Sequence, residues 1–223
     1  DEGLLKRNLD VLKNVRESSS CKILLALKGF AMFSTFPLIQ QYLDGVAASS
    51  VDEARLGHEE FKGEVHVCAP AYRDDEFEEL VKYSDHIVFN SLSQWVHYKD
   101  KCLRSSKTLK CGLRINPQHS EVKVPLYDPC APGSRLGIKG GKLIEEDLEG
   151  ITGLHFHTLC ELNSDSLQRT LKAVEEKFGS LLEKMEWVKF EGGHHISRPD
   201  NDSELICLIN YGFRRKCNLE VCL

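Results

Sequence analysis

Short runs of consecutive apolar residues alternate along this chain with segments whose apolar residues recur every three or four positions. Continuous apolar runs are typical of strands buried on both faces of a parallel sheet, and the longer spacing is typical of helices that cover such a sheet. The runs predict eight strands, at residues 21–27, 46–50, 65–69, 86–89, 109–115, 153–157, 187–190 and 219–223. The periodic segments predict helices at residues 1–17, 30–43, 51–61, 74–83, 93–103, 165–185 and 203–214.

The order of these elements limits the fold. Eight strands that alternate with helices have the count and order of a (β/α)8 TIM barrel, which is an α/β fold. An open, doubly wound sheet would use the same elements, but no reversal of strand order is obvious, so the barrel is favoured. Both folds place their chemistry at the carboxyl ends of the strands. Those ends carry polar residues that we expect to form one ring: Lys28, Ser49, Ser50, Asn90, Arg114, Asn116, His155, His157, Glu191, Gly192 and Gly193.

The segment 118–141 breaks the alternation of strands and helices, and it is rich in proline and glycine. A loop of this length inside a compact domain is usually functional or disordered. Its apolar residues indicate that it packs against the rest of the protein; they are Leu126, Tyr127, Leu136 and Ile138.

Composition excludes several classes of function. The chain has 223 residues, of which 41% are hydrophobic and 28% charged, and its net charge is −5. No basic stripe with interleaved aromatic residues is present, so we expect no nucleic-acid partner. The longest uncharged stretch, residues 29–43, is too short to span a membrane, so no membrane association is expected either. Nine cysteines form no C-x-x-C pair and several lie within apolar runs, which predicts reduced thiols in a cytoplasmic protein.

A lysine and two glycines suggest a cofactor. Lys28 follows the first predicted strand, where a lysine can lose its proton and attack a carbonyl, or can simply mark the point at which the strand meets water. Gly192 and Gly193 follow the seventh strand, where glycine N–H groups often bind phosphate in barrels, although paired glycines also mark ordinary turns. The two features together suit a phosphorylated aldehyde that is bound as a Schiff base, which is pyridoxal phosphate.

Two histidines at the end of the sixth strand admit more than one interpretation. His157 could stack on a cofactor ring, or it could be a core histidine that bonds a backbone carbonyl. His155 lies on the same face of the strand. The pair could instead bind a metal ion, together with Cys160, Glu161, His194 and His195. A metal-dependent hydrolase is disfavoured, because the His-x-His pair of those barrels belongs on the first strand.

Five segments of the sequence resemble carboxynorspermidine decarboxylase, which is also called carboxyspermidine decarboxylase. They are residues 26–30, 125–130, 134–138, 155–161 and 192–195. The Pro-Leu-Tyr-Asp-Pro-Cys loop and the His-x-Leu-Cys-Glu motif are specific to this narrower family. The family belongs to the pyridoxal phosphate enzymes of the alanine racemase fold, known as fold type III, and the likeness covers essentially the whole chain.

This resemblance implies an activity and a set of site residues. The activity is the decarboxylation of a small-molecule polyamine precursor, carboxynorspermidine or carboxyspermidine, to norspermidine or spermidine by a cytoplasmic homodimer. Lys28 would bind the cofactor as a Schiff base, and His157 would stack on its ring. Gly192 and Gly193 would bind the phosphate, and Arg135 lies in a loop that approaches the cofactor in relatives. Glu161 and His194 match family motifs, but we assign them no chemical task.

The sequence also departs from the family. Relatives usually carry three glycines at the phosphate loop, whereas here Glu191 precedes only two. The family continues after the eighth strand with a Glu-Pro-Gly segment, whose glutamate partners the pyridinium nitrogen, and with a β domain that brings a catalytic cysteine. We therefore expect residues 1–223 to be the pyridoxal phosphate-binding barrel domain, truncated at both ends and poorly active alone. Two alternatives stay open: a stand-alone barrel that binds pyridoxal phosphate without turnover, and a metal-dependent barrel hydrolase.

Overall fold

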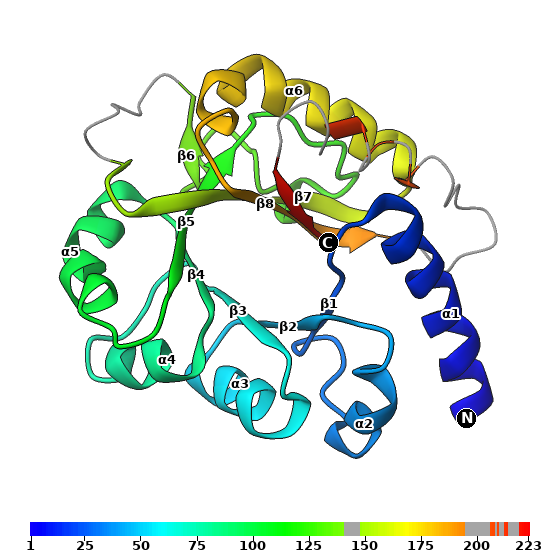
Figure 1. The fold of residues 1–223 in the computed structure, drawn as a ribbon. Helices are drawn as coiled ribbons and strands as arrows, with labels where there is room; N and C mark the ends of the chain where they lie inside the picture. Colours follow the sequence, from blue (N-terminus) through cyan, green and yellow to red (C-terminus); the bar gives the residue numbers. More distant parts are fainter. Residues whose placement is uncertain (141–147, 195–205, 208, 210–211, 214–218) are drawn as a thin grey trace.

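Parallel strands form one curved sheet with helices on its outer side, as the computed structural model of the protein shows (Figure 1). The structure describes residues 1–140, 148–194, 206–207, 209, 212–213 and 219–223. The sheet order is β1-β2-β3-β4-β5-β7-β8-β9, and β6 pairs only with β5. The strands are β1 (Leu24–Ala26), β2 (Gly45–Ala48), β3 (Glu64–Cys68), β4 (His86–Phe89), β5 (Lys110–Asn116), β6 (Ile138–Lys139), β7 (Ile151–Leu162), β8 (Trp187–His194) and β9 (Glu220–Cys222).

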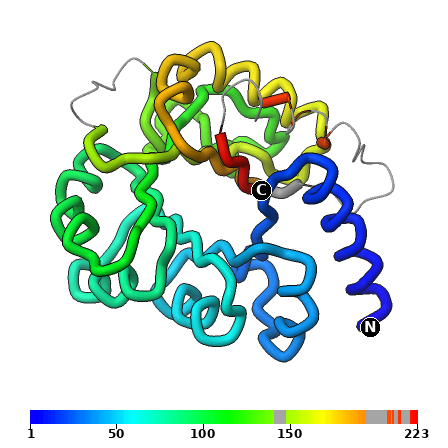
Figure 2. Tube along the Cα trace, in the orientation of Figure 1, coloured from blue at the N-terminus to red at the C-terminus, as the bar shows by residue number. Residues whose placement is uncertain are grey.

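The sheet closes on itself between its first and last strands. The backbone N–H of Lys22 donates to the carbonyl of Val221 at 2.8 Å, and that of Leu24 donates to the carbonyl of Leu223 at 2.9 Å. The N–H of Leu223 donates back to Lys22 at 2.9 Å. The C-terminus consequently lies beside β1, whereas the N-terminus lies at the far end of the first helix (Figure 2). The predicted (β/α)8 barrel is confirmed, and the open sheet is not.

Helices cover the outside of the barrel between successive strands. The α-helices are α1 (Glu2–Ser19), α2 (Phe36–Ile39), α3 (Val51–Leu56), α4 (Phe77–Tyr83), α5 (Leu92–Leu103) and α6 (Ser164–Leu182). Shorter helical turns occur at η1 (Phe33–Thr35), η2 (Gly57–Phe61, a π-helix that continues α3) and η3 (Pro125–Tyr127). The helical spacing of apolar residues in α6 predicts a stripe that faces the barrel, and its members are buried except for the half-buried Leu181: Leu167, Leu171, Val174, Phe178 and Leu182. No helix among the described residues is both long and apolar enough to cross a membrane.

The structure differs from the sequence-based expectations at several places, among them the unpredicted strand β6 and the start of α4 at Phe77 rather than at residue 74. The helix predicted over residues 30–43 is reduced to η1 and α2, because Pro37 in a continuous helix would clash with the carbonyl four residues earlier. Strands β7 and β8 run further than expected, so Gly192 and Gly193 lie within β8 rather than in a loop after it. The helix predicted over residues 203–214 lies mostly outside the described residues; residues 206–207, 209 and 212–213 are helical.

The interior of the barrel is built around Trp187 of β8. Its ring is fully buried and lies across the interior, edge-on to His86 of β4 with ring centroids 5.0 Å apart. A Cβ atom at Gly153 would lie 2.0 Å from this indole, and one at Gly112 would lie 2.5 Å from it. Glycine at these two positions therefore gives the indole its space. The buried part of the protein also holds polar residues: His66, His86, Arg114, His155 and Lys189.

Candidate active site

Two adjoining cavities open at the carboxyl ends of the strands. The first has a volume of about 400 Å³. Its lining includes residues that end or follow β1, β2, β3, β7 and β8, and it reaches further along the barrel wall to Leu12 of α1, Ile23, Leu43 and Leu223. The second has a volume of about 410 Å³ and extends beneath the loop that contains Leu126 and Leu136. Both are lined by Lys28, Ser49, Cys68, His157 and Glu191, so we describe them together as the site mouth. Most of the ring predicted from the strand ends is thus brought together.

Lys28 lies at the edge of the site mouth, in a turn that directly follows β1. The N–H groups of Gly29 and Phe30 both donate to the carbonyl of Ala26, at 3.0 and 3.1 Å, and this closes the turn. The side chain of Lys28 is exposed, and no residue of the described part of the chain forms a hydrogen bond or ion pair with its amine. An amine without a partner at the rim of a cavity is available to attack a carbonyl.

His157 is fixed by a carboxylate on the neighbouring strand. The register of β7 and β8 pairs His157 with Glu191, and Nδ1 of the ring lies 3.0 Å from Glu191 Oε2. Glu191 Oε1 lies 2.5 Å from the Nζ of Lys189, which is 1% exposed. Arg114 Nη2 donates to the carbonyl of His157 at 3.4 Å. Because an ionised carboxylate only accepts hydrogen bonds, Nδ1 is the protonated nitrogen, which sets both the tautomer and the ring orientation.

Burial and neighbouring charges set the protonation states in the site mouth. Burial alone would raise the pKa of Glu191, but the nearby Lys189 ammonium and two histidines lower that pKa well below its ordinary value. Burial lowers the pKa of His155 well below its ordinary value, so this imidazole is neutral. Burial raises the pKa of Cys68 to about 12, which keeps it a thiol rather than a nucleophilic thiolate. Of these three groups, Glu191 is therefore an ionised carboxylate paired with Lys189, His155 is a neutral imidazole, and Cys68 is an unreactive thiol.

Two asparagines of the predicted ring hold the long loop against the barrel. Asn90 Nδ2 donates to the carbonyl of Arg135 at 2.9 Å, and Asn90 Oδ1 accepts from the N–H of Gly137 at 3.0 Å. Asn116 Nδ2 donates to the carbonyls of Leu136 and Pro129, at 3.0 and 3.2 Å. Of the four apolar residues from which we predicted that the loop packs, Ile138 is buried and Leu136 is half-buried, but Leu126 and Tyr127 are exposed. The side chain of Arg135 is exposed and is not among the residues that line the site mouth.

Gly192 brings the backbone of β8 directly against the cavity. Its φ is +141°, and a Cβ atom there would lie 2.2 Å from the carbonyl oxygen of Leu159 on β7. A side chain is therefore excluded for steric reasons. Gly193 follows in the same strand, and His194 pairs through its backbone with Leu162. His195 lies outside the described residues.

The residues of the site mouth fit an aldehyde cofactor such as pyridoxal phosphate. Lys28 supplies an uncommitted amine, His157 a fixed imidazole, and Gly192 a strand backbone without a side chain. The carboxylate of Glu191 would repel a phosphate, but its charge is balanced by Lys189.

The same residues offer a weaker fit to a metal ion. His155, His157 and Glu191 place one ligand atom each within 4.8 Å of one another. The Lys189 ammonium already contacts this carboxylate and opposes a second cation there. Cys160 lines the site mouth, and Glu161 lines an adjoining cavity of about 610 Å³ that shares Tyr127 and Cys160 with it. The metal set suggested by the sequence is thus only partly assembled in the part of the chain that the structure describes.

Sequence reasoning missed Lys189 and Cys68. The sequence Trp-Val-Lys-Phe-Glu could have revealed Lys189. Alternate residues of a strand share a face, so a lysine two positions before Glu191 can pair with its carboxylate. Cys68 ends β3 and lines both cavities, but a cysteine in an apolar run has no pattern that separates core from site.

Comparison with known proteins confirms the resemblance inferred from the sequence. No family model matches the chain. The chain is 42% identical over 204 residues to carboxyaminopropylagmatine decarboxylase of Synechocystis sp., a match that covers 92% of this chain and 52% of that protein. It is 40% identical over 223 residues to carboxynorspermidine/carboxyspermidine decarboxylase of Campylobacter jejuni, covering 100% of this chain and 57% of that protein.

Solved structures agree. Carboxynorspermidine decarboxylase of Campylobacter jejuni, solved in complex with norspermidine, matches with a TM-score of 0.89 and 38% identity, over 99% of this chain and 56% of that chain. Diaminopimelate decarboxylase of Helicobacter pylori, solved in complex with L-lysine, matches with a TM-score of 0.71 at 14% identity, which shows the fold alone. The chain spans about half the length of the curated relatives it matches.

Proposed function

We propose that this chain is the cofactor-binding barrel of a pyridoxal phosphate-dependent carboxynorspermidine/carboxyspermidine decarboxylase. The observation that carries the proposal is the unpartnered amine of Lys28 at the rim of a cavity that His157 also lines. The structural match to a decarboxylase in complex with norspermidine, at a TM-score of 0.89, supports it. The reaction would be the decarboxylation of a carboxylated polyamine precursor to norspermidine or spermidine, in polyamine biosynthesis.

Each residue of the site mouth would have a defined task. Lys28 would bind the aldehyde carbon of the cofactor, and His157 would lie against its ring in the orientation that Glu191 imposes. The backbone of Gly192 and Gly193 would face the phosphate, whereas Arg135, which does not line the site mouth, would reach the cofactor only if its exposed side chain turned inward. When bound, pyridoxal phosphate supplies an electron sink for the charge that remains on the substrate carbon after carbon dioxide leaves.

The surroundings of the site mouth support a partner and a compartment. Leu126 and Tyr127 stand 85% and 62% exposed on the loop that borders it, which suits coverage by a second copy in a homodimer. Cys68, Cys102, Cys111, Cys130, Cys160 and Cys222 are free thiols, which suits a reducing, cytoplasmic setting.

An absorbance spectrum with and without added pyridoxal phosphate tests the cofactor assignment. We expect a visible band from the lysine-bound cofactor in the wild-type protein and in Lys172→Ala, which changes an exposed lysine of α6. Lys28→Ala should lack the band. Borohydride reduction followed by peptide mass mapping should place the cofactor on Lys28. A wild-type protein without a band, or a band that persists in Lys28→Ala, would contradict the assignment.

The substrate is tested by carbon dioxide release from carboxynorspermidine, carboxyspermidine and carboxyaminopropylagmatine. The relatives are named for these different substrates, so the three compounds should be compared side by side. Release from one or more of them supports the decarboxylase. A cofactor band with no release from any of the three would favour the stand-alone barrel without turnover.

The metal-dependent hydrolase is the second candidate, and the grouping of His155, His157 and Glu191 is the observation in its favour. Metal analysis of the same sample decides it. Stoichiometric zinc that disappears in His157→Ala, together with the absence of a visible band, would support the hydrolase over the decarboxylase.

A further inference from the structure

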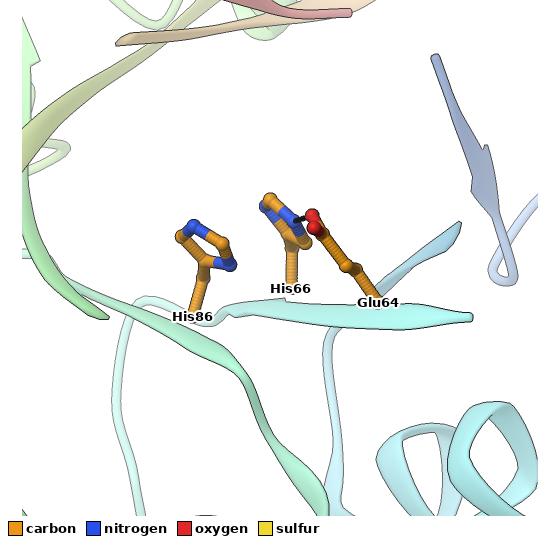
Figure 3. Close-up of side chains that lie close together, drawn as sticks. All are labelled: Glu64, His66 and His86. Carbon is orange, nitrogen blue, oxygen red and sulfur yellow. Dashed lines mark hydrogen bonds and ion pairs between the residues drawn. The ribbon is translucent and has the colours of Figure 1, made fainter. Parts of the chain in front are cut away.

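Three potential metal ligands converge at the end of the barrel opposite the site mouth. Glu64 and His66 lie two positions apart on β3 and therefore share a face, and the strand register pairs His66 with His86 of β4. All three side chains project from the same side of the sheet (Figure 3). One ligand atom from each lies within 4.8 Å of the other two. We refer to these three residues as the lower cluster.

The histidines of the lower cluster are buried but incompletely bonded. His66 is 1% exposed and His86 is 2% exposed. His66 Nε2 lies 3.0 Å from Glu64 Oε2, but His66 Nδ1 and both ring nitrogens of His86 have no hydrogen-bond partner in the described part of the chain. Buried polar atoms are nearly always paired, because an unpaired one loses its hydration without compensation. Three such nitrogens at one place are available to bind a ligand that these residues do not themselves supply.

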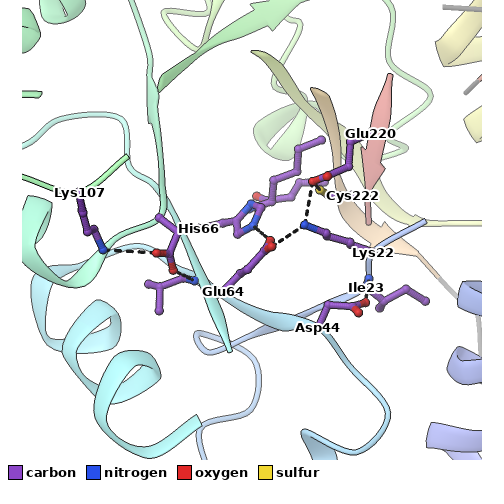
Figure 4. Close-up of polar contacts among 12 residues, drawn as sticks. Lys22, Ile23, Asp44, Glu64, His66, Lys107, Glu220 and Cys222 are labelled. Carbon is purple, nitrogen blue, oxygen red and sulfur yellow. Dashed lines mark hydrogen bonds and ion pairs between the residues drawn. The ribbon is translucent and has the colours of Figure 1, made fainter. Parts of the chain in front are cut away.

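Charged groups of both signs lie around the lower cluster. Lys22 Nζ lies 2.5 Å from Glu64 Oε1 and 3.0 Å from Glu220 Oε1 (Figure 4), so two carboxylates share one ammonium. The charges of Lys110, Lys189 and Glu191 also act on His66, so the imidazole and carboxylate donors, rather than a net negative charge, would hold an ion here. The contact with Lys22 fixes the Glu64 carboxylate with its second oxygen toward His66. Glu64 is partly exposed, which gives an ion a route from solvent. Burial keeps both imidazoles neutral, since it lowers the pKa of His86 to about 2 and that of His66 well below its ordinary value.

We propose that Glu64, His66 and His86 bind one divalent transition-metal ion, of the Zn²⁺ class, at the amino end of the barrel. Two neutral imidazoles and a carboxylate are a set of ligands that such ions favour. The two rings are stacked, with centroids 3.7 Å apart and planes at 17°, so one ring must turn before both can address one ion. His86 can turn without losing a hydrogen bond, because both of its nitrogens are unpartnered.

The proposed ion would have a structural task. It would join β3 to β4 at the end of the barrel where residues typically contribute to stability rather than to chemistry. Its site is separate from Lys28 and the site mouth, so the proposal does not depend on the proposed function.

Metal titration of the full chain, without an affinity tag and after treatment with EDTA, tests the proposal. We expect one Zn²⁺ per chain in a competition titration with a chromogenic chelator, a visible absorbance spectrum with Co²⁺, and a higher melting temperature with Zn²⁺. His86→Phe keeps an aromatic ring beside Trp187 and should weaken Zn²⁺ binding about tenfold or more. Two controls should bind as the wild type does: His157→Ala, which disrupts the grouping in the site mouth, and His97→Ala, which changes an exposed histidine paired with Asp74.

Two outcomes would overturn the proposal. One is a wild-type chain that binds no Zn²⁺ after EDTA treatment. The other is binding that is lost in His157→Ala but retained in His86→Phe, which would place the ion in the site mouth. If His86→Phe does not fold, Glu64→Gln replaces it, because glutamine keeps the shape of the side chain and removes the anionic ligand; unchanged affinity in that variant would equally overturn the site.

Discussion

Replacement of Lys189 by methionine tests the electrostatic basis of the site mouth. Lys189 is 1% exposed, and its Nζ lies 2.5 Å from Glu191 Oε1. Methionine is similar in length and apolar, so Lys189→Met removes the positive charge with little change in volume. The carboxylate of Glu191 is then left in the barrel interior without its cation.

The expected loss follows from the burial of this pair. Removal of one partner from a buried ion pair typically costs about 3–5 kcal/mol, because the remaining charge is neither hydrated nor compensated. Glu191 keeps its contact with His157 Nδ1 at 3.0 Å, so we expect a loss near the lower end, about 3 kcal/mol at pH 7. Such a loss is a large fraction of the ~5–15 kcal/mol by which domains are stable.

Urea denaturation at pH 7 and pH 5 provides the assay. In the wild type, the pKa of Glu191 is lowered, so its contribution is present above the pKa of the unfolded chain and is lost as the pH falls. Without Lys189, burial is the largest remaining influence on the pKa of Glu191 and acts to raise it, so we expect the contribution of Glu191 to be lost as the pH rises. The variant should therefore be less impaired at pH 5 than at pH 7.

A double variant separates this explanation from a packing defect. Lys189→Met combined with Glu191→Gln removes both charges and should recover most of the lost free energy of unfolding. A loss below ~1 kcal/mol for Lys189→Met at pH 7, or a double variant as unstable as the single one, would refute the reasoning.

Three further predictions concern packing, acid stability and the long loop. Gly153→Ala should lower the free energy of unfolding in urea by about 1–3 kcal/mol, because its Cβ would lie 2.0 Å from Trp187. Gly179→Ala in α6 meets no neighbour within 4 Å and should raise the free energy of unfolding by about 0.5–1 kcal/mol. Equal effects of the two substitutions would contradict this explanation. Burial lowers the pKa of His86 to about 2, so the contribution of His86 to stability is present above pH ~6.5 and is lost as the pH falls. In EDTA, His86→Phe should reduce the slope of the free energy of unfolding against pH by up to ~1.4 kcal/mol per pH unit between pH 6 and 4. An unchanged slope would show that His86 does not take up a proton on unfolding. Asn116→Ala removes two hydrogen bonds to loop carbonyls and should speed proteolytic cleavage within residues 118–137 several-fold. Identical cleavage rates in the variant and the wild type would show that other contacts hold the loop.

The barrel was predictable from the sequence because each strand is a local feature. An apolar run followed by a polar residue marks both a buried strand and its carboxyl end, which is enough to place Lys28 and His157 at one end of a barrel. The break at Pro37 was also local, but a helical spacing of apolar residues obscured it.

Contacts between strands were harder to predict than the strands themselves. The pairing of Glu191 with His157 depends on the register of β8 against β7, and apolar runs do not specify register. The lower cluster likewise depends on the register of β3 against β4. The extension of β8 through Gly192 could not be predicted either, because paired glycines usually indicate a turn; the close approach of Leu159 requires one here.

The seam between the first and last strands has a consequence for the order of folding. Neighbouring strands such as β3 and β4 can associate early, since little chain separates them, whereas the bonds from Lys22 and Leu24 reach Val221 and Leu223 across almost the whole sequence. Closing so large a loop costs the most chain entropy, so this seam should form last and be the first to open. Lys22 forms an ion pair with Glu220 across it, at 3.0 Å. We therefore expect the ion pair between Lys22 and Glu220 to form only after the other strands of the barrel have paired.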